Sequence, residues 1–113
     1  MTAQAVARGD VFWVELDPVR GSEIAKTRPC VILSSDEVNR RRRTVIVVPL
    51  TNTPQSACFP LLVAVPSAGS HSKARTEQLR NVDKSRLQRR IGQISAGDLL
   101  AISQGVVRVL GLA

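Results

Sequence analysis

Aromatic residues are almost missing from this 113-residue sequence: tyrosine is absent, and only Phe12, Trp13 and Phe59 are present. Aromatic rings are the platforms on which proteins stack the bases of single-stranded nucleic acids. A chain with three such rings cannot hold a nucleic acid strand mainly by stacking. Any binding of that kind must therefore depend on charge and hydrogen bonds.

Metal ligands and partners for a nucleophile are also scarce. His71 is the single histidine, and it lies in the small-residue segment SAGSHSK. The cysteines Cys30 and Cys58 do not form a ligand pair; each lies in or beside an apolar run, and we interpret both as reduced core thiols. Walker-type and GxGxxG loops are absent. We therefore expect no metal site and no cofactor, and any catalysis must use arginines, carboxylates, hydroxyls and backbone amides.

Long hydrophobic runs are missing too. No apolar segment approaches the roughly 20 residues that span a bilayer, and no basic-then-apolar signal segment opens the sequence. Hydrophobic residues nevertheless make up 43% of the chain, which is enough for a packed core. We expect a single cytoplasmic domain over residues 1–113, with residues 1–8 as a loose lead-in and no membrane partner.

Basic charge, in contrast, is in excess. The chain has 16 Lys and Arg against 9 Asp and Glu, a formal charge of +7. Most of these cations are arginines, whose planar guanidinium matches phosphate oxygens. This excess predicts a polyanionic partner, most simply nucleic acid. The alternative is a basic protein that is merely soluble.

Short strand-like runs recur about every ten to fifteen residues, separated by Gly, Pro, Ser and Asn. This spacing is typical of a small barrel or sandwich, so we predict a mainly-β fold. The run Arg40–Arg43 is interpreted as a turn between two of the strands. The expected strands are 10–17, 29–34, 44–51, 59–65, 74–79 and, more weakly, 85–94.

The last segment, 95–111, has the pattern of a helix. Ser95 is the expected N-cap, with Asp98 three residues later, and Gly111 fits a C-terminal stop. Gly105 should weaken this helix by about 1 kcal/mol. The apolar residues at helical spacing are Leu99, Ile102, Val106 and Val109.

The strand faces suggest a further surface. In the first strand, alternate side chains face opposite ways, so Phe12, Val14 and Leu16 should point inward. The other set is Val11, Trp13 and Glu15. Apolar residues on both faces of the third and fourth runs exceed what one barrel interior can bury. We therefore predict a homodimer, unless the helix covers all of this surplus.

Three motifs carry a resemblance to a known family. Residues 8–35, RGDVFWVELDPVRGSEIAKTRPCVILSS, contain the pattern G-D-V/I-x-W-V, then D-P-x-x-G-S-E, then R-P-x-V-x-L-S. Residues 47–51 read VVPLT, and residues 74–87 read ARTEQLRNVDKSRL. In this order they resemble the MazF/PemK/Kid toxins of bacterial type II toxin–antitoxin systems. The resemblance runs from about residue 8 to residue 94.

The resemblance implies an SH3-like barrel of about five to seven antiparallel strands with a C-terminal helix. It also implies a homodimer and a metal-independent endoribonuclease. Proteins of this family cut single-stranded RNA, mostly mRNA, at short sequences. The ribose 2′-hydroxyl is the nucleophile, and the products carry a 2′,3′-cyclic phosphate and a 5′-hydroxyl. A cognate antitoxin of the MazE/PemI type blocks the RNA site.

Matching residue by residue, Arg28 corresponds to the arginine at the strand entry and Thr51 to the threonine that ends the PLT strand. Glu23 matches an acid in the loop after the first strand. Arg75 and Glu77 resemble the arginine–acid pair of the Kid branch, in which the acid is an aspartate; the MazF branch lacks that arginine. The resemblance thus makes these five residues catalytic. It leaves open which of them is the general base and which the general acid.

RNA contacts are expected around this cluster, mainly from cations and polar side chains. The expected RNA-binding residues are Lys26, Thr27, Asn52, Gln78, Arg80, Lys84 and Arg86. The run Arg40–Arg43 either keeps the surface soluble or grips phosphates outside the scissile step.

Two other functions fit part of the pattern. A gyrase poison of the CcdB type would share the barrel and the dimer but has no use for the TRP, PLT and ARTEQ clusters. A non-catalytic barrel that binds nucleic acid would explain the charge but not the acids.

Overall fold

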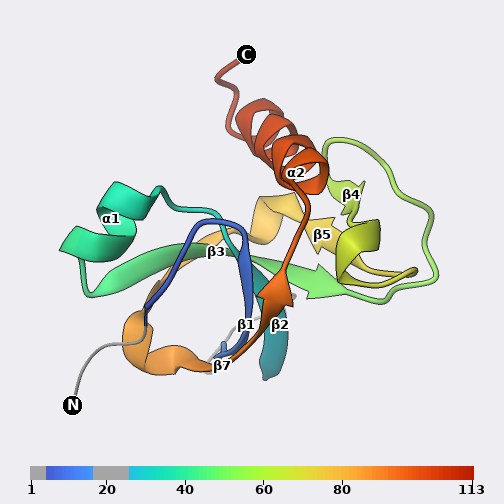
Figure 1. Ribbon diagram of the computed structural model, residues 1–113. Coiled ribbons are helices and arrows are strands. Elements are labelled where there is room, and N and C mark those ends of the chain that lie inside the picture. Colours follow the sequence, from blue (N-terminus) through green and yellow to red (C-terminus); the bar gives the residue numbers. More distant parts are fainter. Residues whose placement is uncertain (1–4, 17–25) are drawn as a thin grey trace.

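A computed structural model describes residues 5–16 and 26–113 (Figure 1). These residues form seven antiparallel strands and a C-terminal helix, which confirms the mainly-β class. The strands are β1 (Asp10–Glu15), β2 (Thr27–Ile32), β3 (Thr44–Thr51), β4 (Leu62–Ala64), β5 (Lys73–Arg75), β6 (Arg80–Asp83) and β7 (Leu87–Gln93). The helices are α1 (Asp36–Arg41) and α2 (Ala96–Val109), and the 3-10 turns are η1 (Pro66–Ala68), η2 (Thr76–Gln78) and η3 (Lys84–Arg86).

Strand β3 organises the sheet, because it is long enough to take three partners. The order is β4-β5-β3-β2-β1-β7, and β6 also pairs with β3. One edge of β3 thus holds β2, while the other holds β6 along its first half and β5 along its end. In the described part of the chain β6 and β7 do not pair, so the sheet curls without closing into a fully hydrogen-bonded barrel.

The sheet has an apolar core on each face. Inside the curl lie Phe12, Val14 and Leu16, all almost fully buried, as the alternation predicted. The second core lies between the sheet and α2, which sits above it in Figure 1. Val11 belongs to this second core and is only 6% exposed, although its face was expected to point outward. The C-terminal helix therefore covers part of the surplus apolar surface.

Helix α1 replaces the turn that the sequence suggested at Arg40–Arg43. Ser35 caps it, accepting a hydrogen bond from the Val38 N–H at 3.3 Å. Acids occupy its first turn and arginines its last, which suits the helix dipole. Six residues are too few to produce an apolar stripe, so hydrophobic spacing gave no sign of it.

Two of the expected strands are shorter than predicted. Residues 59–61 form a turn, in which the Leu61 and Leu62 N–H groups both donate to the Cys58 carbonyl at 2.9 Å. Strand β5 ends at Arg75 because Thr76 turns inward, is fully buried, and donates its hydroxyl to the Pro60 carbonyl. The chain then forms η2 before resuming as β6. The weakly predicted last strand is present as β7.

The C-terminal helix begins where the sequence predicted. The Ser95 hydroxyl accepts a hydrogen bond from the Asp98 N–H at 3.1 Å. Of the two cysteines, Cys30 is a buried core thiol as expected, but Cys58 is exposed because it lies in the turn before β4. No helix within residues 5–16 and 26–113 is both long and apolar enough to cross a bilayer.

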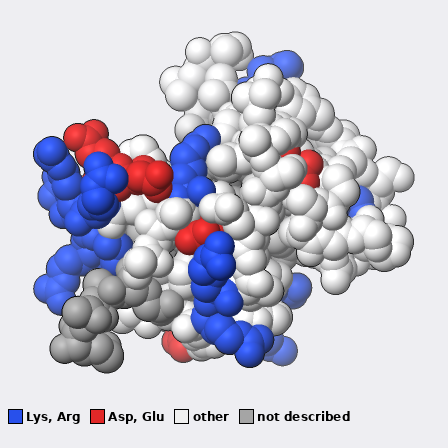
Figure 2. All heavy atoms as spheres, in the orientation of Figure 1, with Lys and Arg blue, Asp and Glu red and all other residues white. Residues whose placement is uncertain are grey.

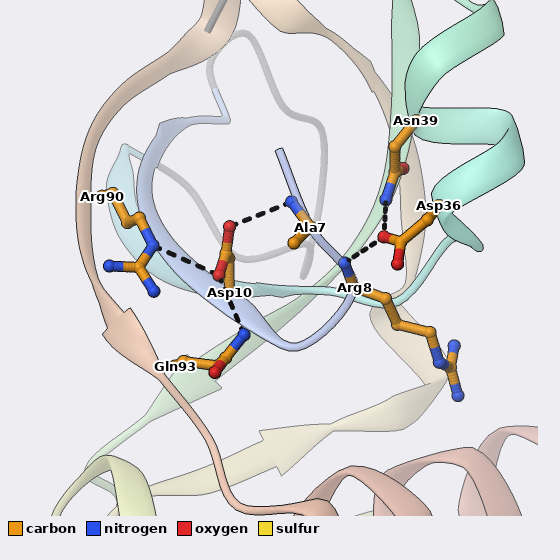
Figure 3. A network of polar contacts seen from close by, with 7 residues as sticks. All are labelled: Ala7, Arg8, Asp10, Asp36, Asn39, Arg90 and Gln93. Atoms are coloured by element: carbon orange, nitrogen blue, oxygen red, sulfur yellow. Dashed lines mark hydrogen bonds and ion pairs between the residues drawn. The ribbon is translucent and has the colours of Figure 1, made fainter. Parts of the chain in front are cut away.

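Polar contacts fasten the start of the chain to the sheet and to α1 (Figure 3). The Asp10 carboxylate is buried; it accepts the Ala7 N–H at 3.0 Å and lies 3.2 Å from Nε of Arg90. The Arg8 N–H donates to the Asp36 carboxylate at 2.8 Å, and its guanidinium donates to the Ser103 hydroxyl of α2 at 2.8 Å. Arg8 is thus firmly held.

Candidate active site

The register of β2 and β3 places Arg28 beside Thr51. Cys30 pairs with Pro49 and Val31 with Val48, so continuing this register by two residues sets Arg28 opposite Thr51. Opposed residues of antiparallel strands point to the same face. Arg28 is exposed and Thr51 half-buried. A guanidinium and a hydroxyl from two strands thus lie on one face of the sheet and remain open to a ligand.

Arg80 approaches the same place from the other edge of β3. It pairs with Val47, which faces the interior of the curl together with Cys30. Burial raises the pKa of the Cys30 thiol to about 12, while the positive charges of Arg80 and Arg28 act in the opposite direction. Both guanidiniums therefore lie within electrostatic range of one thiol, and together they make this end of the sheet face cationic.

Lys73 is a residue that the sequence reasoning missed. It pairs with Thr51 across β5 and β3, on the side opposite Arg28. Its ammonium donates to the carbonyls of Thr53 at 3.2 Å and His71 at 3.4 Å. Thr51 is therefore flanked by a cation on each neighbouring strand. The signal was the alternation of Lys73 with Arg75, two cations that share one face of a short strand.

Arg75, Glu77 and Gln78 lie where β5 leads into η2. Arg75 is half-buried and, two residues after Lys73, faces the same side. Glu77 is exposed on η2, and Gln78 beside it is half-buried. The turn is held by the Thr76 N–H, which donates to the Leu61 carbonyl at 3.3 Å. Because β5 and β6 pair with the same edge of β3, η2 presents Glu77 between two strands of the site.

The other predicted RNA-binding residues separate into two groups. Lys26 has a positive φ of 68°, and its carbonyl accepts the Leu16 N–H at 2.9 Å, so it lies where the chain enters β2. Thr27 begins β2, and the exposed Asn52 directly follows Thr51. Both therefore border the strand ends that carry Arg28 and Thr51.

Lys84 and Arg86 lie on η3, which follows the end of β6 that is farther from Arg80. The Lys84 ammonium donates to the Asn39 carbonyl in α1, and the Arg86 guanidinium donates to the Glu15 carbonyl at 3.2 Å. Glu23 falls outside the described residues. Within the described ranges, no three His, Cys, Asp or Glu side chains gather as metal ligands would.

Comparison with known proteins decides the family. Residues 7–110 match the family of PemK-like, MazF-like toxins of type II toxin–antitoxin systems. The chain belongs to this toxin family. Endoribonuclease MazF9 of Mycobacterium tuberculosis is 36% identical over 107 residues, which are 88% of this chain and 91% of the relative. The family prediction, and with it the class of toxin endoribonuclease, is confirmed over the gyrase-poison alternative.

Solved structures of related toxins have the same fold. MazF from Deinococcus radiodurans superposes with a TM-score of 0.82 at 22% identity, covering 96% of this chain and 98% of that one. An endoribonuclease in complex with its cognate antitoxin, from a mycobacterial species, gives 0.80 at 24% identity, with coverages of 96% and 98%. The open curled sheet with its C-terminal helix is therefore the fold of these toxins.

Proposed function

We propose that this toxin cleaves single-stranded RNA, and mRNA in particular, at short sequences, by attack of a ribose 2′-hydroxyl on the adjacent phosphate. The 5′ oxygen leaves with a proton, so the products are a 2′,3′-cyclic phosphate and a 5′-hydroxyl, and no metal or cofactor takes part. The observation that carries the proposal is the opposition of Arg28 and Thr51 on one open sheet face, with Arg80 nearby.

Each step requires a group that this part of the chain presents. Arg28 and Arg75 would stabilise the negative charge that develops on the phosphoryl oxygens, and one of them would protonate the leaving oxygen. Thr51 would donate a hydrogen bond to the phosphate and hold it in line. Glu77, exposed on η2, would accept the 2′ proton. Glu23, which precedes β2 in the sequence, would be the fifth catalytic residue.

RNA binding around the scissile step would use the polar groups that border these residues. Guanidinium and ammonium groups contact phosphates, whereas amides and hydroxyls read base edges in single strands. The residues concerned would be Lys26, Thr27, Asn52, Gln78 and Arg80.

We further infer that the chain acts as a single-domain cytoplasmic protein, forms a homodimer, and is blocked by a cognate antitoxin. Structures of a mycobacterial endoribonuclease with its cognate antitoxin and of MazE–MazF from Deinococcus radiodurans support the last point. Large apolar side chains left exposed near α2 support an interface, since single chains seldom expose such clusters. They are Phe59, Leu61, Leu100 and Leu110.

The test is primer extension on long RNA that has been incubated with the toxin in the presence of a chelator. Discrete stops are expected at one short sequence, with equal yield with and without the chelator. The same RNA carrying a 2′-deoxyribose at the cut site should stay intact. Cleavage of that RNA would reject the internal nucleophile, and absence of any cleavage would reject the nuclease proposal.

Substitutions then test the assigned groups. Arg28→Ala or Thr51→Ala should lower kcat by about 10²–10³, because each removes a donor aimed at the charge of the transition state. Arg89→Ala, which removes an exposed arginine from β7, is the control and should cut normally. Near-normal cleavage by the folded Arg28 and Thr51 variants would remove those residues from the mechanism.

A further inference from the structure

A second group of cations gathers on one side of the molecule (Figure 2), where the side chain of Lys84 on η3 reaches α1. We call it the α1–η3 surface. The Thr44–Asp83 pairing and a 2.8 Å hydrogen bond from the Lys84 N–H to the Arg43 carbonyl join its two parts. It consists of Arg40, Arg41, Arg42, Arg43, Lys84 and Arg86.

Contacts within the protein neutralise little of this positive charge. The C-terminus of a helix carries only about half a negative charge, and the Lys84 ammonium already binds there, at the Asn39 carbonyl. Arg41 lies 3.6 Å from Glu37, but both side chains are largely exposed, so the pair contributes little. No ion pair is found for Arg40 or Arg42 within the described residues.

Among the described residues, the carboxylates near Arg40–Arg43 are already engaged. Asp36 is engaged by the Arg8 and Asn39 N–H groups. A hydrogen bond from the Ser85 N–H is the main cause that lowers the pKa of the exposed Asp83, and the charges of Arg43 and Arg86 add to it. One carboxylate therefore serves two arginines. The remaining positive charges repel one another, and a polyanion bound along them would relieve this repulsion.

The surface begins beside the candidate active site. The Arg86 guanidinium donates to the Glu15 carbonyl at 3.2 Å, and Glu15 pairs with Thr27, the residue before Arg28. Cations therefore run from the start of β2 across η3 to α1.

We propose that the α1–η3 surface binds phosphates of the RNA segment that flanks the cleavage site. The proposal rests on the proposed nuclease function. Protein partners are usually held by apolar and aromatic anchors, whereas nucleic acid interfaces are polar and strongly positive. Among the described residues, Val38 and Ile46 are the exposed large apolar side chains near these four successive exposed arginines. Such a surface fits phosphates better than an antitoxin segment.

The experiment compares two RNAs that share the cleavage sequence found by primer extension. The short RNA holds only that sequence, and the long RNA extends it on both sides. The variant is Arg40→Gln with Arg42→Gln, because these side chains form no ion pair with any described residue. The control, Arg89→Gln, removes an arginine from an exposed position on β7. kcat/KM is measured for each protein over a salt series.

The two substitutions should lower kcat/KM for the long RNA only. Two phosphate contacts on a single strand account for about 1.4 of the log–log salt slope, which is up to about 25-fold in affinity at about 0.1 M salt. Cleavage of the short RNA, and of both RNAs by the control, should be unchanged. If the wild-type toxin cuts neither RNA, the nuclease proposal itself fails.

Three results would overturn the flanking-site proposal while the nuclease proposal stands. They are equal losses on both RNAs, equal losses in the control, and no loss at all. Weaker binding of an acidic antitoxin peptide by the variant, with unchanged cleavage of the long RNA, would assign the surface to a protein partner instead.

Discussion

Gly105 in α2 offers a sharp test of how the helix packs on the sheet. A methyl group added there would lie 3.0 Å from the Pro60 carbonyl oxygen, 3.1 Å from Cγ2 of Thr76 and 3.2 Å from Cγ2 of Val63. Gly97, near the start of the same helix, has nothing within 4 Å of its added methyl. Alanine at the two positions therefore meets very different surroundings.

The magnitudes follow from two opposing effects. Alanine in a helix is favoured over glycine by up to about 1 kcal/mol, and Gly97→Ala should gain some or all of this. Gly105→Ala should gain the same amount but lose about 1–3 kcal/mol to overpacking. The Pro60 carbonyl is backbone and already accepts the Thr76 hydroxyl, so it cannot move away easily. We expect Gly105→Ala to lower the free energy of unfolding by up to about 2 kcal/mol.

Urea unfolding of both variants and the wild type, at one protein concentration and with the slope m compared, measures these changes. Gly97→Ala should unfold at a higher urea concentration than Gly105→Ala by the equivalent of about 1–3 kcal/mol. Equal stabilisation by both substitutions would show that α2 does not pack closely against η2 and β4.

Three further predictions concern the buried Asp10 carboxylate and the two cysteines. Asp10→Asn should lower the free energy of unfolding by about 1–3 kcal/mol. The reason is that the amide N–H₂ would face another donor, either the Ala7 N–H or Nε of Arg90. A variant as stable as the wild type in urea would contradict this. For the cysteines, alkylation of the native protein followed by mass spectrometry should label the exposed Cys58 rapidly and Cys30 only on unfolding, whereas equal labelling rates would refute the buried site. Burial raises the pKa of Cys30 from 9.0 to about 12, so the stability that the protonated thiol contributes is complete below pH 9 and falls as the pH rises toward 12. Cys30→Ala should therefore make the urea midpoint depend less on pH over this range. A variant whose midpoint depends on pH as the wild type's does would contradict this.

The sequence by itself determined the features that depend on neighbours along the chain. Alternation in the first strand identified Phe12, Val14 and Leu16 as interior, because successive strand residues always point to opposite faces. The cap at Ser95 could also be predicted, since it depends on a hydroxyl and on an N–H only three residues later. The three motifs identified the family for the same reason: each is contiguous.

Only the tertiary structure decided which distant residues meet. Val11 is buried because α2 folds back over its face of the sheet, and strand alternation cannot show that both faces are covered. Gly105 lowers the helix propensity of its segment, but Pro60 and Thr76 lie so close to it that a larger residue would not fit. Lys73 beside Thr51 and Arg86 beside Glu15 depend on strand pairing and on the curl of the sheet. Such contacts are set by packing between segments far apart in the chain, which local pattern and propensity do not encode.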